Sequence, residues 1–163
     1  MQTIDPALQK AVWERVLGHA PAKTENRPEA GPPTAELLRF LEDERDGAAA
    51  YRRLSRRLWG QDAALLRRIA EEARMHCQVL HAAYFAETGQ RANLAPQEPS
   101  SLPPAPEALL SARNREREKA RTYEEAAKRW PSLSEDFQEM AEDKRRRAQC
   151  LHVLLGRLLC GHS

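Results

Sequence analysis

Hydrophobic residues recur at intervals of three and four along four long stretches of the chain, which is the spacing of one face of an α-helix. The pattern predicts helices at about 35–59, at about 62–88, at about 107–130, and from a capping box of Ser132 with Glu135 to about 159. Thr34 and Asp62 are the expected N-caps of the first two, and Gly89 is expected to end the second. Five acidic or basic residues fall among the apolar residues of these inner faces: Glu44, His76, Glu116, Lys144 and Arg147. The chain is therefore expected to be all-α, with ionisable groups inside its core.

Proline-rich segments separate these helices from one another and from the start of the chain. Asp5 followed by Pro6 predicts a short helix at about 6–17, because aspartate caps a helix and proline fits its first turn. The prolines of 19–33 predict an extended linker, so the expected organisation is 1–33 as helix and linker and 34–163 as one bundle. Five further prolines in 90–106 predict a long connection rather than a tight turn.

The two halves of the predicted bundle repeat one another. A shift of 72 residues places Glu44 and Tyr51 on Glu116 and Tyr123. A shift of 71 residues places 69–81 on 140–152, with these matches: Ala70, Glu71, Arg74, Gln78, Leu80 and His81 on Ala141, Glu142, Arg145, Gln149, Leu151 and His152. Two helical hairpins related by duplication predict a four-helix bundle.

Composition narrows the class of protein but not its partner. The 163 residues suffice for one domain, and a net charge of +2 does not favour a nucleic-acid partner. Charged residues in Met1–Gly18 exclude the apolar core of a signal peptide there, and no stretch is apolar enough to span a membrane. Three cysteines without metal-finger spacing are typical of a reduced, cytoplasmic protein.

The repeated residues resemble the rubrerythrin-like branch of the ferritin-like superfamily. The resemblance implies a four-helix bundle in which the first helix of each hairpin gives a glutamate with a tyrosine seven residues later, and the second gives a Glu-x-x-His pair. Glu44 with Tyr51 and Glu116 with Tyr123 stand at the first-helix positions, and His76 stands at the first histidine. In the family, four carboxylates and two imidazoles of this kind enclose two iron ions.

The resemblance covers about 35–159 and fails at three of the six ligand positions. Ala73 stands where the first Glu-x-x-His has its glutamate, and Lys144 and Arg147 stand where the second has its glutamate and histidine. The chain also has no Cys-x-x-Cys pair of a rubredoxin module. The resemblance therefore implies a degenerate di-iron site.

The replacements suggest that ion pairs now do what the metal does in the family. Buried charges persist only when they are paired, and the charges of Glu44 and Glu116 are balanced by those of Lys144 and Arg147. An alternative is that Lys144 and Arg147 extend to solvent along their apolar stems, which is easier for Arg147. Four acidic side chains lie about 100° or more from the inner face and are not expected to act as replacement metal ligands: Glu71, Glu72, Glu142 and Asp143.

Two functions are consistent with this pattern. The first is a bundle with no cofactor and a non-catalytic binding or structural role, with a second copy of the chain or another protein as its partner. The second is a rubrerythrin-type peroxidase or iron oxidase, in which Glu44, His76 and Glu116 form a residual site for iron or another divalent metal. The metal content of the purified protein distinguishes them.

Overall fold

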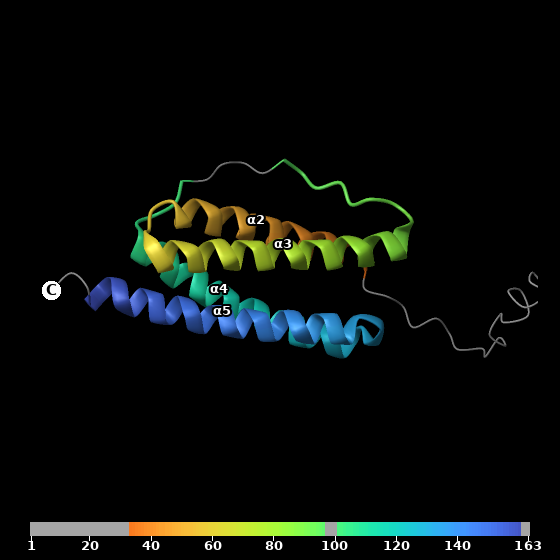
Figure 1. The fold of residues 1–163 in the computed structure, drawn as a ribbon. Helices are drawn as coiled ribbons and strands as arrows, with labels where there is room; N and C mark the ends of the chain where they lie inside the picture. The colour runs from red at the N-terminus through yellow and green to blue at the C-terminus, as the bar shows by residue number, and fades with distance from the viewer. Residues whose placement is uncertain (1–32, 97–100, 161–163) are drawn as a thin grey trace, which may run out of the picture.

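The computed structural model describes residues 33–96 and 101–160, and this part of the chain is almost entirely helical (Figure 1). Its elements are α2 (Thr34–Ser55), α3 (Gly60–Thr88), α4 (Ala105–Arg129), the short 3-10 helix η1 (Pro131–Leu133) and α5 (Ser134–Cys160). The described residues include no strand, so the predicted all-α class with four long helices is confirmed. The helix predicted at 6–17 and the linker that follows it lie outside the described residues.

The four helices form two antiparallel hairpins that face each other. Helix α2 packs on α3 and α4 packs on α5, and Figure 1 shows the first pair lying over the second. The connection between the hairpins returns along the bundle, so that α3 and α4 run in the same direction (Figure 1). Both described parts of this connection are bound to the first hairpin, because Arg45 on α2 donates to the carbonyl of Ala95, and Arg57 in the turn after α2 donates to those of Leu102 and Pro103.

The turn between α2 and α3 lies earlier than the sequence pattern predicted. Helix α2 ends at Ser55 rather than 59, and α3 begins at Gly60 with Trp59, not Asp62, as its N-cap. Gly60 has a φ of +54°, a left-handed conformation that costs little only for glycine. The chain therefore turns between Ser55 and Gly60, and Gly60 supplies the left-handed conformation at the start of α3.

The caps of the other helices also differ in part from the prediction. Thr34 is the first residue of α2 rather than its cap, and Pro33 precedes it without a side-chain hydrogen bond. Ser132 lies inside η1, so the capping box with Glu135 predicted for the last helix is wrong, and α5 begins at Ser134. The predicted stop at Gly89 is confirmed, with a φ of +67° that suits a helix C-cap.

The apolar core has two parts, one toward each end of the bundle. The first cluster comprises Leu37, Phe40, Leu41, Leu80, Ala83, Tyr123, Ala126, Ala127, Phe137, Met140 and Ala141. The second comprises Tyr51, Leu54, Leu66, Ile69, Ala70, Ala108, Leu109, Ala112, Leu151, Leu154 and Leu155. The inward acidic and basic residues lie between them along every helix, so apolar side chains separate those charges from both ends of the bundle.

The outer surface of the bundle is mostly charged. Among residues 33–96 and 101–160, no helix is both long and apolar enough to cross a lipid bilayer. This follows from the charged and polar residues on the outer face of each helix, which keep every long stretch from being continuously apolar.

Candidate functional site: a buried ion-pair cluster

Five residues from four helices meet at the centre of the bundle, and we call them the buried ion-pair cluster: Glu44, His76, Glu116, Lys144 and Arg147. Their exposed fractions are 0% for Glu44, 6% for His76, 5% for Glu116, 2% for Lys144 and 1% for Arg147. The inward placement predicted from the helical spacing is therefore confirmed for all five. Helices α2 and α4 supply the acids, α3 supplies the histidine and α5 supplies the two cations.

The ammonium group of Lys144 lies between the two buried carboxylates. Its Nζ is 2.7 Å from Oε1 and 2.9 Å from Oε2 of Glu44, and 3.5 Å from Oε2 of Glu116. Because Lys144 donates to both oxygens of Glu44, its side chain points into the core. The alternative in which Lys144 extends to solvent is wrong.

Two tyrosines connect the hairpins by crossed hydrogen bonds. Tyr51 on α2 donates to Oε1 of Glu116 on α4 at 2.7 Å, and Tyr123 on α4 donates to Oε1 of Glu44 on α2 at 2.9 Å. The pattern is reciprocal because α2 and α4 run in opposite directions and both carry the tyrosine seven residues after the glutamate. Burial, followed by the charge of the accepting glutamate, raises the pKa of each phenol well above its usual value, so both tyrosines stay protonated donors.

His76 bridges an inner and an outer carboxylate. Its Nδ1 is 3.3 Å from Oε2 of Glu44, and its Nε2 is 3.0 Å from Oδ2 of Asp143. Nε2 is also 3.5 Å from Nη2 of Arg147, which only donates, so this nitrogen lies between a hydrogen-bond acceptor and a donor. Partial burial acts to raise the pKa of Asp143, but the hydrogen bond from His76 and the charge of Arg146 lower it.

Arg147 crosses the core instead of leaving it. Its Nε donates to Oε2 of Glu72 at 3.1 Å, while its Nη1 lies 3.8 Å from Oε2 of Glu44 and 4.0 Å from Oε2 of Glu116. The solvent-directed alternative for Arg147 is therefore also wrong. The guanidinium group instead lies among three carboxylates from three different helices.

Glu72 and Asp143 take part in the network although their helical positions are off the inner face. Arg146 bridges them at the surface, 3.5 Å from Glu72 and 2.6 Å from Asp143. The network then has the carboxylates Glu44, Glu72, Glu116 and Asp143 and the permanent cations Lys144, Arg146 and Arg147. The sequence holds one signal of this contribution. Ala73 has no charged group at its inward position, which leaves room there for the carboxylate of its neighbour Glu72.

The whole arrangement keeps Glu44 ionised. Burial alone acts to raise the pKa of this carboxyl group, but the charge of Lys144 and the hydrogen bond and charge of His76 offset it and bring the pKa well below the ordinary 4.5. A carboxyl group whose pKa is lower in the folded than in the unfolded state stabilises the fold above its unfolded pKa. That contribution is lost as the pH falls.

Acid should therefore destabilise the protein in part through Glu44. We expect the free energy of unfolding to decrease as the pH falls below about 4.5, the ordinary value for this group. Urea unfolding, followed by circular dichroism from neutral pH down to about pH 3, measures this decrease. The variant Glu44→Gln should be less stable at neutral pH and lose less stability on acidification. An equally steep decrease in that variant would contradict the role of Glu44.

The same residues are poorly suited to hold a metal. Both oxygens of Glu44 already accept hydrogen bonds from Lys144, and Ala73, buried at 1% exposure, offers no ligand atom. In the described part of the chain, no group of three or more histidine, cysteine, aspartate or glutamate side chains is arranged to bind a metal ion. Glu44, His76 and Glu116 are thus brought together, but around an ammonium group. The donor set does not fit the di-iron centre that the resemblance implies.

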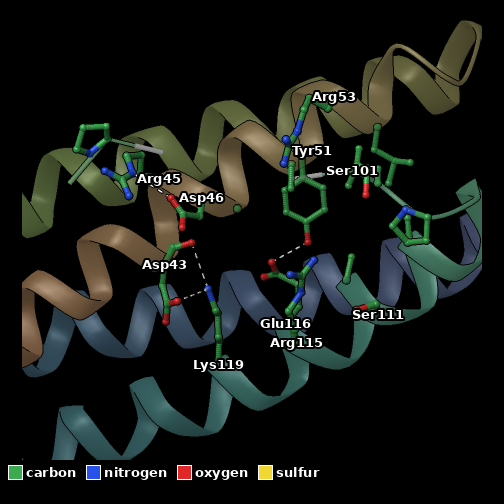
Figure 2. A pocket seen from close by; sticks show the side chains of 18 residues that line it. Asp43, Arg45, Asp46, Tyr51, Arg53, Ser101, Ser111, Arg115, Glu116 and Lys119 are labelled. Carbon is green, nitrogen blue, oxygen red and sulfur yellow. Dashed lines mark hydrogen bonds and ion pairs between the residues drawn. The ribbon is translucent and has the colours of Figure 1, made fainter. Parts of the chain in front are cut away.

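A cavity of about 570 Å³ leads from the surface to the acid on α4 (Figure 2). It lies between α2, α4 and the connection, and both Tyr51 and Glu116 line it. Figure 2 shows the hydrogen bond between them, beside the pair in which Lys119 donates to the backbone carbonyl of Asp43 at 3.2 Å. Burial, followed by the charge of Lys144, lowers the pKa of Lys119. Because Glu116 lines the cavity, the cavity gives small ions a route to this acid.

Comparisons of the chain with protein-family models, with curated proteins and with solved structures found no match.

Proposed function

We propose that this protein is a non-catalytic, ferritin-like four-helix bundle in which a buried ion-pair cluster has replaced a di-iron centre. The observation that carries the proposal is the position of the Lys144 ammonium group, within 3.5 Å of carboxylate oxygens from both Glu44 and Glu116. Two like charges in a protein core require a cation between them, and here a side chain supplies it.

An internal cation also opposes metal binding. A divalent ion at Glu44 and Glu116 would lie next to the charge of Lys144 and would have to displace its hydrogen bonds. A metal that activates oxygen or peroxide further needs an open coordination position. The acids are instead covered by Tyr51, Tyr123 and Lys144, which favours a structural role for the cluster.

The role of the protein would then lie in binding through its surface. A second copy of the chain or another protein is the proposed partner, with the segment 1–33 or an outer helix face as the contact. The ion-pair cluster would contribute specificity to the fold, because its buried charges are paired between the two hairpins.

Metal analysis tests the proposal. We expect protein purified without chelators and incubated with ferrous iron to contain far less than one iron per chain. The cavity that reaches Glu116 makes this test fair, because iron has a path to the acids. Stoichiometric iron that is lost in Glu116→Ala, and kept in the control Glu118→Ala on the exposed face of the same helix, would overturn it. That result would favour the residual site of Glu44, His76 and Glu116.

A further inference from the structure

A second polar site lies on the outer face of the α4–α5 hairpin, away from the ion-pair cluster. It is a hollow of about 380 Å³ lined by Arg113, Arg117, Arg145, Ala148, Gln149 and His152. The methyl group of Ala148 leaves space between the helices, and longer side chains surround it. No carboxylate lines this hollow.

Hydrogen bonds hold Arg113 at one side of the hollow. Arg113 is held by Asn114, whose Oδ1 accepts from its Nε at 3.3 Å and from its Nη2 at 3.0 Å. Its Nη1 lies 3.3 Å from Nδ1 of His152. Arginine only donates, so in this contact Nδ1 of His152 accepts and the ring proton is on Nε2. His152 can therefore donate a hydrogen bond from Nε2.

The charge of the hollow is only partly compensated. Arg145 forms an ion pair with Glu124. Arg113 has only neutral partners, and within the described part of the chain neither Arg113 nor Arg117 forms an ion pair with a carboxylate. Two guanidinium groups four residues apart on one helix face therefore carry uncompensated charge of +2.

The first hairpin provides a comparison inside the same molecule. Arg145, Gln149 and His152 repeat Arg74, Gln78 and His81, and Arg117 repeats Arg45. In the first copy these arginines are already paired: Arg74 with Glu71 at 2.6 Å and Arg45 with Asp46 at 3.0 Å. The counterpart of Arg113 is Leu41, a fully buried core residue. Only the second copy therefore combines the repeated motif with uncompensated arginines.

We propose that this hollow binds the phosphate group of a small molecule. A phosphate ester carries a charge between −1.5 and −2 at neutral pH, which matches the two uncompensated arginines. The planar fork of each guanidinium suits phosphate oxygens, and His152 and Gln149 add donors from the second helix. A small molecule rather than a nucleic acid is favoured because the basic lining is confined to one hollow and the whole chain has a net charge of only +2.

Titration of the full-length chain with pyrophosphate, at constant ionic strength set by chloride, tests the site. We expect saturable binding by calorimetry, and a loss of affinity of about tenfold or more in Arg113→Gln/Arg117→Gln. The matched control is Arg45→Gln/Arg74→Gln, which changes arginines of the first hairpin and should keep the affinity. Melting temperatures of both variants show that they are folded.

Three results would overturn this proposal. They are no saturation by pyrophosphate, an equal loss of affinity in the control variant, and binding of a single-stranded oligonucleotide without binding of pyrophosphate. The last would identify the face as a nucleic-acid surface. The hollow lies outside the buried ion-pair cluster, so none of these results changes the iron content that tests the proposed function.

Discussion

Replacing Lys144 with alanine should lower the free energy of unfolding by about 3–5 kcal/mol, the usual cost of removing one partner of a buried ion pair. The reason is that Glu44, with 0% exposure, would lose the donor to both of its oxygens, and Glu116 would lose its closest cation. Glu44 has no exposed surface, and Glu116 borders the cavity with only 5% of its surface exposed, so neither carboxylate recovers much hydration. Equilibrium unfolding in urea measures the difference.

Two further variants separate charge from packing. Lys144→Met keeps most of the side-chain volume, so its loss of stability reports the charge rather than a cavity. Lys128→Ala removes an exposed lysine from the end of α4 and should change stability by no more than about 0.5 kcal/mol. Adding Glu44→Gln to Lys144→Met should cost less than the sum of the single changes, because the acid then no longer needs its cation. A Lys144→Met protein as stable as the wild type would contradict the pairing.

Restoring the three changed ligand positions should restore iron binding. The triple variant Ala73→Glu/Lys144→Glu/Arg147→His returns the carboxylates and the imidazole that the family resemblance places there, while Glu44 and Glu116 are kept. We expect about two iron ions per chain, the number that the family binds, where the wild type binds essentially none. Metal analysis and the melting temperature with and without ferrous iron measure the change.

The melting temperature of the triple variant gives a second test of metal binding. Without metal, the triple variant places four carboxylates in one core and should be much less stable than the wild type, and iron should raise its melting temperature. The control Ala73→Glu/Arg147→His keeps the ammonium of Lys144 and should bind little iron. If the triple variant folds but takes up no iron, the helices are spaced unsuitably for a metal centre.

Helical periodicity was sufficient to predict which residues face the core. Each residue turns the helix by about 100°, so Glu44 and Lys144 follow the direction of their apolar neighbours whatever their charge. Their burial at 0% and 2% exposure is confirmed. Periodicity does not predict the crossed hydrogen bonds of Tyr51 and Tyr123. These bonds depend on the direction of α2 and on its position along α4.

The ion pairs of residues off the inner face were not predicted from the sequence. The direction of a Cβ atom says little about the end of a long side chain, and Arg147 extends far enough to reach Glu72 on α3. Asp143 was likewise set aside, although His76 approaches it from the neighbouring hairpin at 3.0 Å. The end of α2 at Ser55 was not predicted either, because residues 56–59 contain no glycine or proline that marks the end of a helix.

The crossed tyrosine bonds make the two halves of the molecule depend on each other. The glutamate of each hairpin accepts a hydrogen bond from the tyrosine of the other hairpin. Because each half leaves one acid and one phenol to the other, neither hairpin satisfies its own buried polar groups when it stands alone.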